Sequence, residues 1–201
     1  MLRRFAQPFH AFQAFREQIW AEFQSHVEDL LSNSQVRRLD LQLQHFKYTR
    51  LRHSMDVAYR CYFFSRLLGW KHSPSVARGA LLHDFFFLEQ GMHCLSLYRS
   101  HPKIALENAR GITSLTPLEQ DMIEKHMFFV NFAWPSCKES ALLILMDQVS
   151  FAAEMVSSLF IRRQMVAALP EARYLSNTEA ASLFQMGLAP SVPDVNSRES
   201  S

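Results

Sequence analysis

The chain of 201 residues can bury the core of one sizeable domain, and its 48% hydrophobic content, with 17 Phe, argues against disorder. A net charge of +2 without a basic run gives no reason to expect nucleic acid as a partner. Three scattered cysteines exclude a disulfide framework and a CxxC zinc site, which favours a cytoplasmic protein. No stretch approaches the ~20 uninterrupted apolar residues of a membrane span.

The N-terminal region is predicted to be helical. Phe9, Phe12 and Phe23 recur at helical spacing, so residues 9–31 are expected to form an amphipathic helix. Its polar face carries both signs of charge, which favours packing against the protein over contact with lipid. We expect residues 1–44 to form an N-terminal helical extension.

Two helices are expected next. The first covers residues 51–68 and ends at Gly69, which is placed to terminate it. The second starts at Ser73, whose hydroxyl can cap it, with Pro74 in the first turn, where a missing N–H costs nothing. This helix is predicted to run to about Phe87.

The second half of the chain contains further helix signals. Pro102 indicates the start of a short helix that Gly111 follows. Sequences of the capping-box type predict helix starts at 116–119, 136–139 and 176–179. The first opens a helix that carries His126, the second a long buried helix or two in succession, and the third a last helix that stops at residue 187. No convincing strand is found, so the predicted fold is all-α, with one domain over 45–187 and a disordered tail over 188–201.

A His-Asp pair lies in the apolar stretch GALLHDFFF, residues 79–87, and Asp147 lies within LLILMDQVSF. A carboxylate in such a setting is costly unless it is paired or bound to a metal. Imidazoles and carboxylates suit Fe, Mn, Co, Ni or Zn. Side chains of adjacent residues diverge by about 100° on a helix, so several helices must converge to build one site. The candidate ligands are His53, His83, Asp84, His101, His126 and Asp147.

In this order the six residues resemble the HD-domain metal-dependent phosphohydrolases, especially small bacterial HD proteins. The resemblance covers roughly residues 45–155 and implies an HD-type helical bundle. It also implies that His53, His83, Asp84 and Asp147 hold a first divalent metal. Asp84 would bridge to a second metal, completed by the two remaining histidines, His101 and His126.

The same resemblance implies hydrolysis of a phosphoester or phosphoanhydride, in a small phosphorylated molecule such as a nucleotide or dinucleotide, by a metal-activated water. Asp84 would act as the catalytic residue that orients this water or accepts its proton. The chain departs from many catalytic members, which have lysines at the positions of Phe87 and Gln148. Relatives that cleave cyclic dinucleotides have two adjacent histidines where this chain has Lys125-His126.

Several cations near the ligands in sequence are candidates for phosphate contacts in place of the missing lysines. Solvated surface charge is the alternative explanation for any one of them. His93 is a candidate seventh participant, as an extra ligand or a substrate contact. The predicted substrate-binding residues are Arg78, Lys103, Lys125 and His93.

Two other functions remain open from the sequence. Some HD-type proteins with four histidines and two aspartates are di-iron oxygenases, which cleave C–C or C–P bonds with dioxygen. A non-catalytic sensor or binding module is the second alternative, and the missing lysines favour it. The sequence does not determine the oligomeric state.

Overall fold

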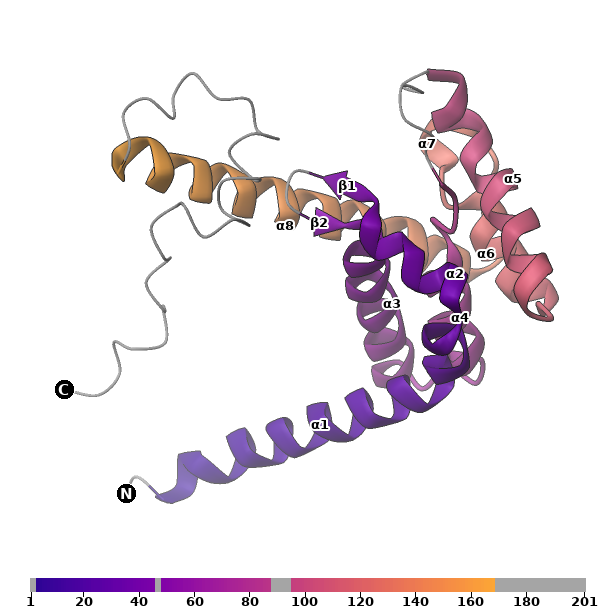
Figure 1. Cartoon of the computed structure of the whole chain (residues 1–201). Helices are drawn as coiled ribbons and strands as arrows, with labels where there is room; N and C mark the ends of the chain where they lie inside the picture. The colour runs from indigo at the N-terminus through magenta and orange to yellow at the C-terminus, as the bar shows by residue number, and fades with distance from the viewer. Residues whose placement is uncertain (1–2, 46–47, 88–94, 169–201) are drawn as a thin grey trace.

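The computed structural model describes residues 3–45, 48–87 and 95–168, and over these residues the predicted all-α fold is confirmed (Figure 1). The predicted last helix and the C-terminal tail lie outside the described residues. The elements in chain order are α1 (Arg3–Ser32), α2 (Ser34–Arg37), the 3-10 helix η1 (Arg38–Leu41), β1 (Leu43–His45), β2 (Tyr48–Thr49), α3 (Arg50–Leu67), α4 (Ser73–Leu82), α5 (Leu95–Ile112), α6 (Pro117–Lys125), α7 (Phe128–Asn131) and α8 (Lys138–Ala168).

The structure contains one small antiparallel sheet that the sequence analysis missed. Strands β1 and β2 pair Leu43 with Thr49 and His45 with Tyr48. The strands have only three and two residues, which is too short for an alternating pattern to stand out. The hairpin matters because it precedes α3 and carries Gln44 toward the centre of the molecule.

Two predicted helix boundaries are wrong. Helix α4 ends at Leu82 instead of Phe87, and the chain turns so tightly that the Phe86 N–H donates to the carbonyl of Asp84 at 2.8 Å. Helix α5 begins before Pro102, which lies inside the helix at the cost of one backbone hydrogen bond. The early end of α4 places the His-Asp pair at the helix end, where His83 keeps helical dihedral angles and the chain turns away after Asp84.

The predicted helix starts differ in outcome. Thr116 and Glu119 form the expected capping box: Thr116 Oγ1 accepts from the Glu119 N–H at 3.3 Å, and Glu119 Oε2 accepts from the Thr116 N–H at 2.7 Å. The second predicted box does not form. Instead, the Ser136 N–H donates to Asp121 Oδ2 at 3.1 Å, and α8 begins two residues later.

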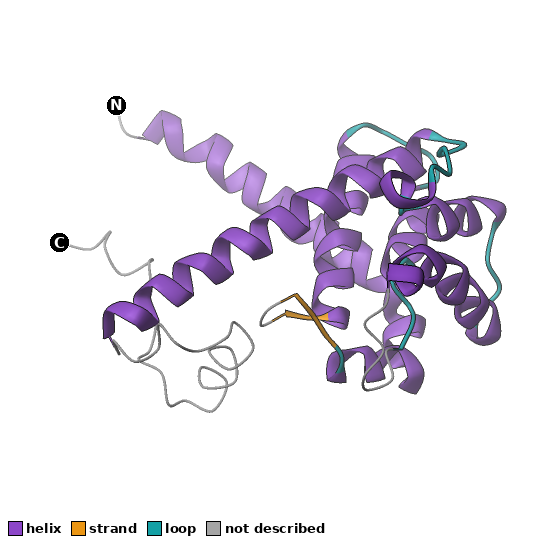
Figure 2. Ribbon diagram, turned by 90° about the horizontal axis from the view of Figure 1, so that it is seen from above, coloured by secondary structure: helices purple, strands orange, loops and turns teal. Residues whose placement is uncertain are grey.

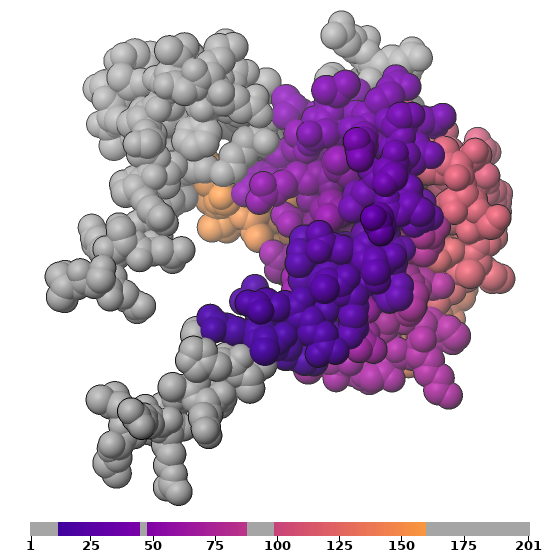
Figure 3. All heavy atoms as spheres, turned by 60° about the horizontal axis from the view of Figure 1, so that its bottom comes forward, coloured from indigo at the N-terminus to yellow at the C-terminus, as the bar shows by residue number. Residues whose placement is uncertain are grey.

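The hydrophobic core lies between α1, α3 and α4 and continues between α5, α6 and the first half of α8. Figure 3 shows α1, in indigo, lying against the purple and magenta surfaces of the following helices. Four side chains of its second half are at most 2% exposed and belong to the same core cluster as α3 and α4; they are Ile19, Phe23, Val27 and Leu30. The division of the chain at residue 44 stays a prediction.

Helix α8 is one continuous helix, and only part of it is buried as predicted. Its C-terminal half projects from the packed helices, as the N-terminal half of α1 also does (Figures 1 and 2). Val156 and Leu159 in this half are 67% and 53% exposed, and Leu145, nearer the start of α8, is 56% exposed. In the described part of the chain, one helical stretch, Lys138–Leu159, is long and apolar enough to cross a membrane, and 33% of it is buried. The core helix of a soluble protein meets the same criterion, so this is weak evidence for a membrane.

Asp121 joins α6 to the first turn of α8. It accepts hydrogen bonds from the Ser136 N–H at 3.1 Å and from Ser140 Oγ at 2.6 Å, and it pairs with Lys125 Nζ at 2.5 Å. Partial burial would raise the pKa of Asp121, but the hydrogen bonds from Lys125, Ser140 and Ser136 outweigh it and lower the pKa to about 2. The charge of Asp121 therefore stabilises this junction at neutral pH.

We expect Asp121→Asn to lower the free energy of unfolding by about 1–2 kcal/mol at pH 7, because the variant loses a charged acceptor of several hydrogen bonds. The stabilisation by ionised Asp121 is complete above the pKa of an unfolded aspartate, about 3.9. It is lost as the pH falls through about 2.

Urea unfolding of wild type and variant between pH 7 and about pH 3 measures this difference, which should shrink with falling pH. Glu124→Gln, at an exposed position of α6, is the control. An equal difference at every pH would show that the charge of Asp121 does not carry the effect.

Candidate metal centre

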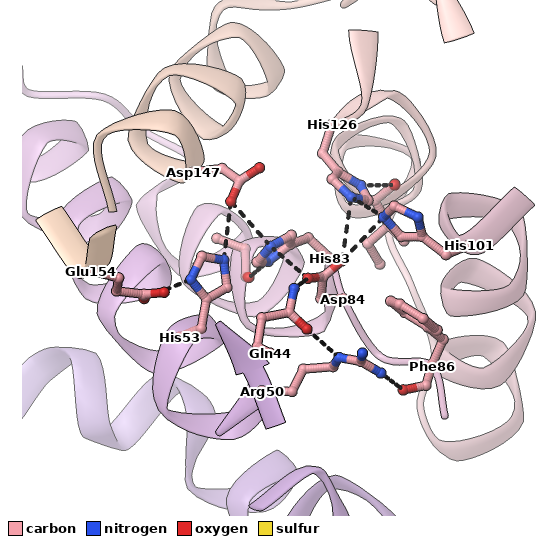
Figure 4. A network of polar contacts seen from close by, with 12 residues as sticks. Gln44, Arg50, His53, His83, Asp84, Phe86, His101, His126, Asp147 and Glu154 are labelled. Atoms are coloured by element: carbon pink, nitrogen blue, oxygen red, sulfur yellow. Dashed lines mark hydrogen bonds and ion pairs between the residues drawn. The ribbon is translucent and has the colours of Figure 1, made fainter. Parts of the chain in front are cut away.

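The six predicted ligands meet at one place in the structure, although they come from five separate parts of the chain (Figure 4). Each is at most 9% exposed. His53 belongs to α3, His101 to α5 and Asp147 to α8, whereas His83, Asp84 and His126 directly follow α4 and α6. The convergence of helices that the sequence required is therefore present.

One group of metal-binding atoms belongs to His53, His83 and Asp84, which lie within 4.8 Å of one another. Asp147 adjoins it, because its Oδ1 lies 3.0 Å from His53 Nε2 and 3.9 Å from His83 Nε2. His83 Nε2 also lies 3.8 Å from Asp84 Oδ2. These are the four residues that the family resemblance assigns to a first metal.

A second group belongs to Asp84, His101 and His126, again within 4.8 Å. Asp84 Oδ1 lies 3.2 Å from His101 Nε2 and 3.4 Å from His126 Nε2, and the two imidazole nitrogens are 2.9 Å apart. Asp84 belongs to both groups, with Oδ2 facing the first and Oδ1 the second. A carboxylate in this position can bridge two cations.

His83 and His126 are oriented by the same local device. Each follows the last residue of its helix, and its Nδ1 lies close to the carbonyl three residues earlier, at 2.7 Å from Ala80 O and 2.8 Å from Ile123 O. An Nδ1–H that donates to a carbonyl leaves the Nε2 lone pair for a metal. Helix ends thus aim both imidazoles into the centre.

A metal ion fits this donor set because the described residues leave buried polar atoms without partners. His83 Nε2 and Glu154 Oε2 are both buried and have no hydrogen-bond partner among them. Leaving such an atom unpaired costs about 1–3 kcal/mol, and more for a charged group. A cation at the centre would satisfy His83 Nε2 directly and compensate the surrounding carboxylates.

The pKa shifts favour metal-binding protonation states at His83 and the two aspartates, and they oppose them at His53 and His126, whose pKa values are raised. Burial lowers the pKa of His83 to about 4, so this imidazole is neutral at pH 7. Burial alone would raise the pKa of Asp84, but the neighbouring imidazoles, His83 first, hold it well below its usual range. For His53, burial opposes protonation, yet hydrogen bonds to Asp147 and Glu154 raise the pKa to about 10. A metal at His53 must therefore displace a proton.

Glu154 is a member of the site that the sequence analysis missed. Its Oε1 lies 2.8 Å from His53 Nδ1, on the side of the ring opposite Asp147, and it is 4% exposed. Its position seven residues after Asp147 places it on the same face of α8, two turns on. The spacing of seven residues can be recognised in the sequence, but only the fold shows that His53 faces Glu154.

Gln44 and Arg50 form a second supporting group behind Asp84. Gln44 Nε2 donates to Asp84 Oδ2, and Arg50 Nε donates to Gln44 Oε1 at 2.6 Å. Arg50 is 2% exposed, donates through Nη1 to Phe86 O and stacks 3.8 Å from the centre of the Phe86 ring. This chain of contacts ties β1 and α3 to the His-Asp turn.

A cavity of about 310 Å³ opens onto the predicted ligands. Four of them reach its surface, together with two neutral amides and four apolar side chains. The lining consists of Asp84, His101, His126, Asp147, Gln44, Gln148, Met127, Phe129, Val130 and Phe151.

The predicted substrate contacts that the structure describes do not line this cavity. Arg78 binds an aspartate of α1 at 2.6 Å and Thr113 at 3.0 Å, and Lys125 pairs with Asp121 at 2.5 Å. Their contacts favour structural roles. Lys103 is exposed on α5, and His93 lies outside the described residues.

Comparison of the chain with models of known protein families, with curated proteins and with solved structures found no match. The resemblance to HD-domain proteins therefore rests on the residues of this chain alone.

We expect Glu154→Gln to weaken the binding of Mn²⁺ about 10–100-fold, because a neutral amide orients His53 and supports its basicity less well than a carboxylate. Titration against a competing chelator measures the affinity. Glu119→Gln is the matched control, since Glu119 is also buried but belongs to the capping box of α6. Unchanged affinity in Glu154→Gln, or an equal loss in both variants, would contradict this role.

Proposed function

We propose that the protein is a metal-dependent phosphohydrolase of the HD type, which holds one or two divalent ions of Fe, Mn, Co, Ni or Zn. The observation that carries this proposal is the position of Asp84, shared by two groups of buried metal-binding atoms. The mixed imidazole and carboxylate donors suit these metals. The open cavity beside them provides room for a substrate.

His53, His83, Asp84 and Asp147 would hold the first metal, and Asp84 would share the second with the two remaining histidines. Bound metals supply Lewis acidity and a water of lowered pKa. Because the pKa of Asp84 lies well below its usual range, this residue stays anionic at neutral pH, as a bridging ligand must.

Hydrolysis requires that a water oxygen bond to phosphorus while the bond from phosphorus to the leaving oxygen breaks. Asp84 lines the cavity and would orient this water by accepting a hydrogen bond from it. Its low pKa makes orientation a better-suited role than permanent uptake of the proton, which would pass on to solvent. The leaving oxygen takes up a proton in turn.

The cavity that opens onto the candidate ligands is small. A volume of about 310 Å³ lies at the lower end of the range for ligand pockets. This favours a phosphorylated molecule no larger than a mononucleotide over a dinucleotide.

The cytoplasm remains the proposed location of the protein.

A di-iron oxygenase is the second candidate, because the apolar side chains around the cavity would also suit dioxygen and a neutral substrate. The same donors can hold iron. The two functions differ in what they consume: hydrolysis needs only water, whereas the oxygenase needs iron and dioxygen.

We expect protein purified without chelators or a polyhistidine tag to contain one or two transition-metal ions, and Asp84→Ala to lose them while remaining helical. Elemental mass spectrometry and circular dichroism measure the two properties. Asp56→Ala, on the solvent side of α3, is the control and should keep the metal. A wild-type chain that stays metal-free after reconstitution would contradict the proposal.

The same preparations then separate the candidate activities. Release of phosphate from a panel of phosphoesters by wild type, and not by Asp84→Ala, would support hydrolysis. Oxygen uptake by the iron-loaded protein would favour the oxygenase. Metal binding without either activity would support a binding module.

A further inference from the structure

One side of the cavity is an apolar wall that adjoins the metal-binding atoms. Met127, Phe129 and Val130 follow the ligand His126 on the chain, and Phe151 lies one helical turn after Asp147 on α8. We call these four apolar residues the apolar wall. The elements that place the candidate ligands thus also place the surface that a bound substrate would touch.

The apolar wall is accessible, and a residue with an uncommon backbone conformation, the C-cap of α7, lies just beyond it. Phe129 is 65% exposed and Phe151 is 37% exposed, so both rings can gain burial when a ligand covers them. Just beyond the wall, Phe132 adopts a left-handed conformation with φ of 52°, which is uncommon for a bulky residue. Strain of this kind persists where the surrounding structure holds it, often at binding sites.

Among the described residues, no lysine or arginine lines the cavity. Its polar side chains other than the candidate ligands are the neutral amides Gln44 and Gln148. The buried cation Arg50 lies behind Gln44 and donates to it and to the carbonyl of Phe86. The described lining therefore offers an anionic substrate no positively charged side chain besides the candidate ligands.

The charge of the centre suits a single phosphoryl group. Asp84, Asp147 and Glu154 are carboxylates, so they offset most of the charge of two divalent ions. A phosphate monoester with a charge near −2 at pH 7 would make the sum of these charges slightly negative, so a further anion would be repelled. A second anionic group would enter a cavity whose described residues offer it no counter-charge, and burying an uncompensated charge is costly.

We propose that the site takes phosphate monoesters whose single phosphoryl group is attached to a compact apolar group, preferably an aromatic ring, and that it disfavours a second anionic group. This inference rests on the proposed function, because the phosphoryl group must be held at the metal centre. The ring lies on the apolar wall, where it buries apolar surface against Phe151 and Phe129.

The test uses Mn²⁺-loaded protein and three phosphonates that cannot be hydrolysed: phenylphosphonate, methylphosphonate and 2-carboxyethylphosphonate. Calorimetry should show phenylphosphonate binding at least about tenfold tighter than methylphosphonate, because the ring buries apolar surface. The 2-carboxyethyl compound should bind no tighter than methylphosphonate, because no lysine or arginine among the described lining residues can pair with its carboxylate.

Three variants locate the effect. Phe151→Ala should remove most of the preference for the ring, whereas Val149→Ala, at a similarly exposed position of α8 outside the cavity, should keep it. Gln148→Lys should raise the affinity for 2-carboxyethylphosphonate relative to methylphosphonate by about three- to tenfold, because it adds a cation to the lining. None of the three residues is a candidate metal ligand.

The outcomes separate this inference from the proposed function. Protein that fails to bind Mn²⁺ would overturn both. Metal-loaded protein that binds the phosphonates without preferring the ring, or that prefers the carboxylate, would overturn the inference and leave a phosphohydrolase standing. Equal effects of Phe151→Ala and Val149→Ala would overturn the assignment of the apolar wall.

Discussion

The burial of the Asp84 carboxylate is the constraint on which the rest of the site depends. Removing this charge from water costs several kcal/mol unless partners compensate it. The partners come from every side: His83 beside it, His101 from α5, His126 from the end of α6 and Gln44 from the hairpin. Each partner must be held within a few ångströms of the Asp84 carboxylate. The packing that positions these elements is therefore also what assembles the site.

The ends of α4 and α6 orient two of the candidate ligands. His83 and His126 both follow a helix and both point Nδ1 at the carbonyl three residues earlier. Because α4 ends at Leu82 and not at Phe87, as its apolar pattern predicted, His83 and Asp84 lie at the end of the helix, where both reach the shared centre. Helix α8 contributes differently, since its straight course places Asp147 and Glu154 on either side of His53.

The sequence predicted what is local and left out what depends on tertiary contacts. Caps such as Thr116 define helix starts within a few residues, and buried carboxylates such as Asp147 stand out against apolar neighbours. Glu154 did not stand out, because only the packing of α3 on α8 brings His53 to it. Arg78 looked like a substrate contact because it is close to the ligands in sequence, but α1 supplies its aspartate partner from 49 residues away. The exposed side of α8 was also unpredictable, since an apolar sequence does not show which side neighbours cover.

The adjacency of the apolar wall to the ligands has an energetic consequence. Met127 follows His126 directly and Phe151 lies one turn from Asp147, so an occupant of the wall would restrict the same backbone that orients both ligands. A metal that fixes these ligands would equally fix the wall for an occupant. Coupling between two binding events is reciprocal, so each should strengthen the other. If the site binds metal and substrate as proposed, an apolar wall built on the ligand-bearing segments would make metal retention depend on substrate, with no need for a separate regulatory element.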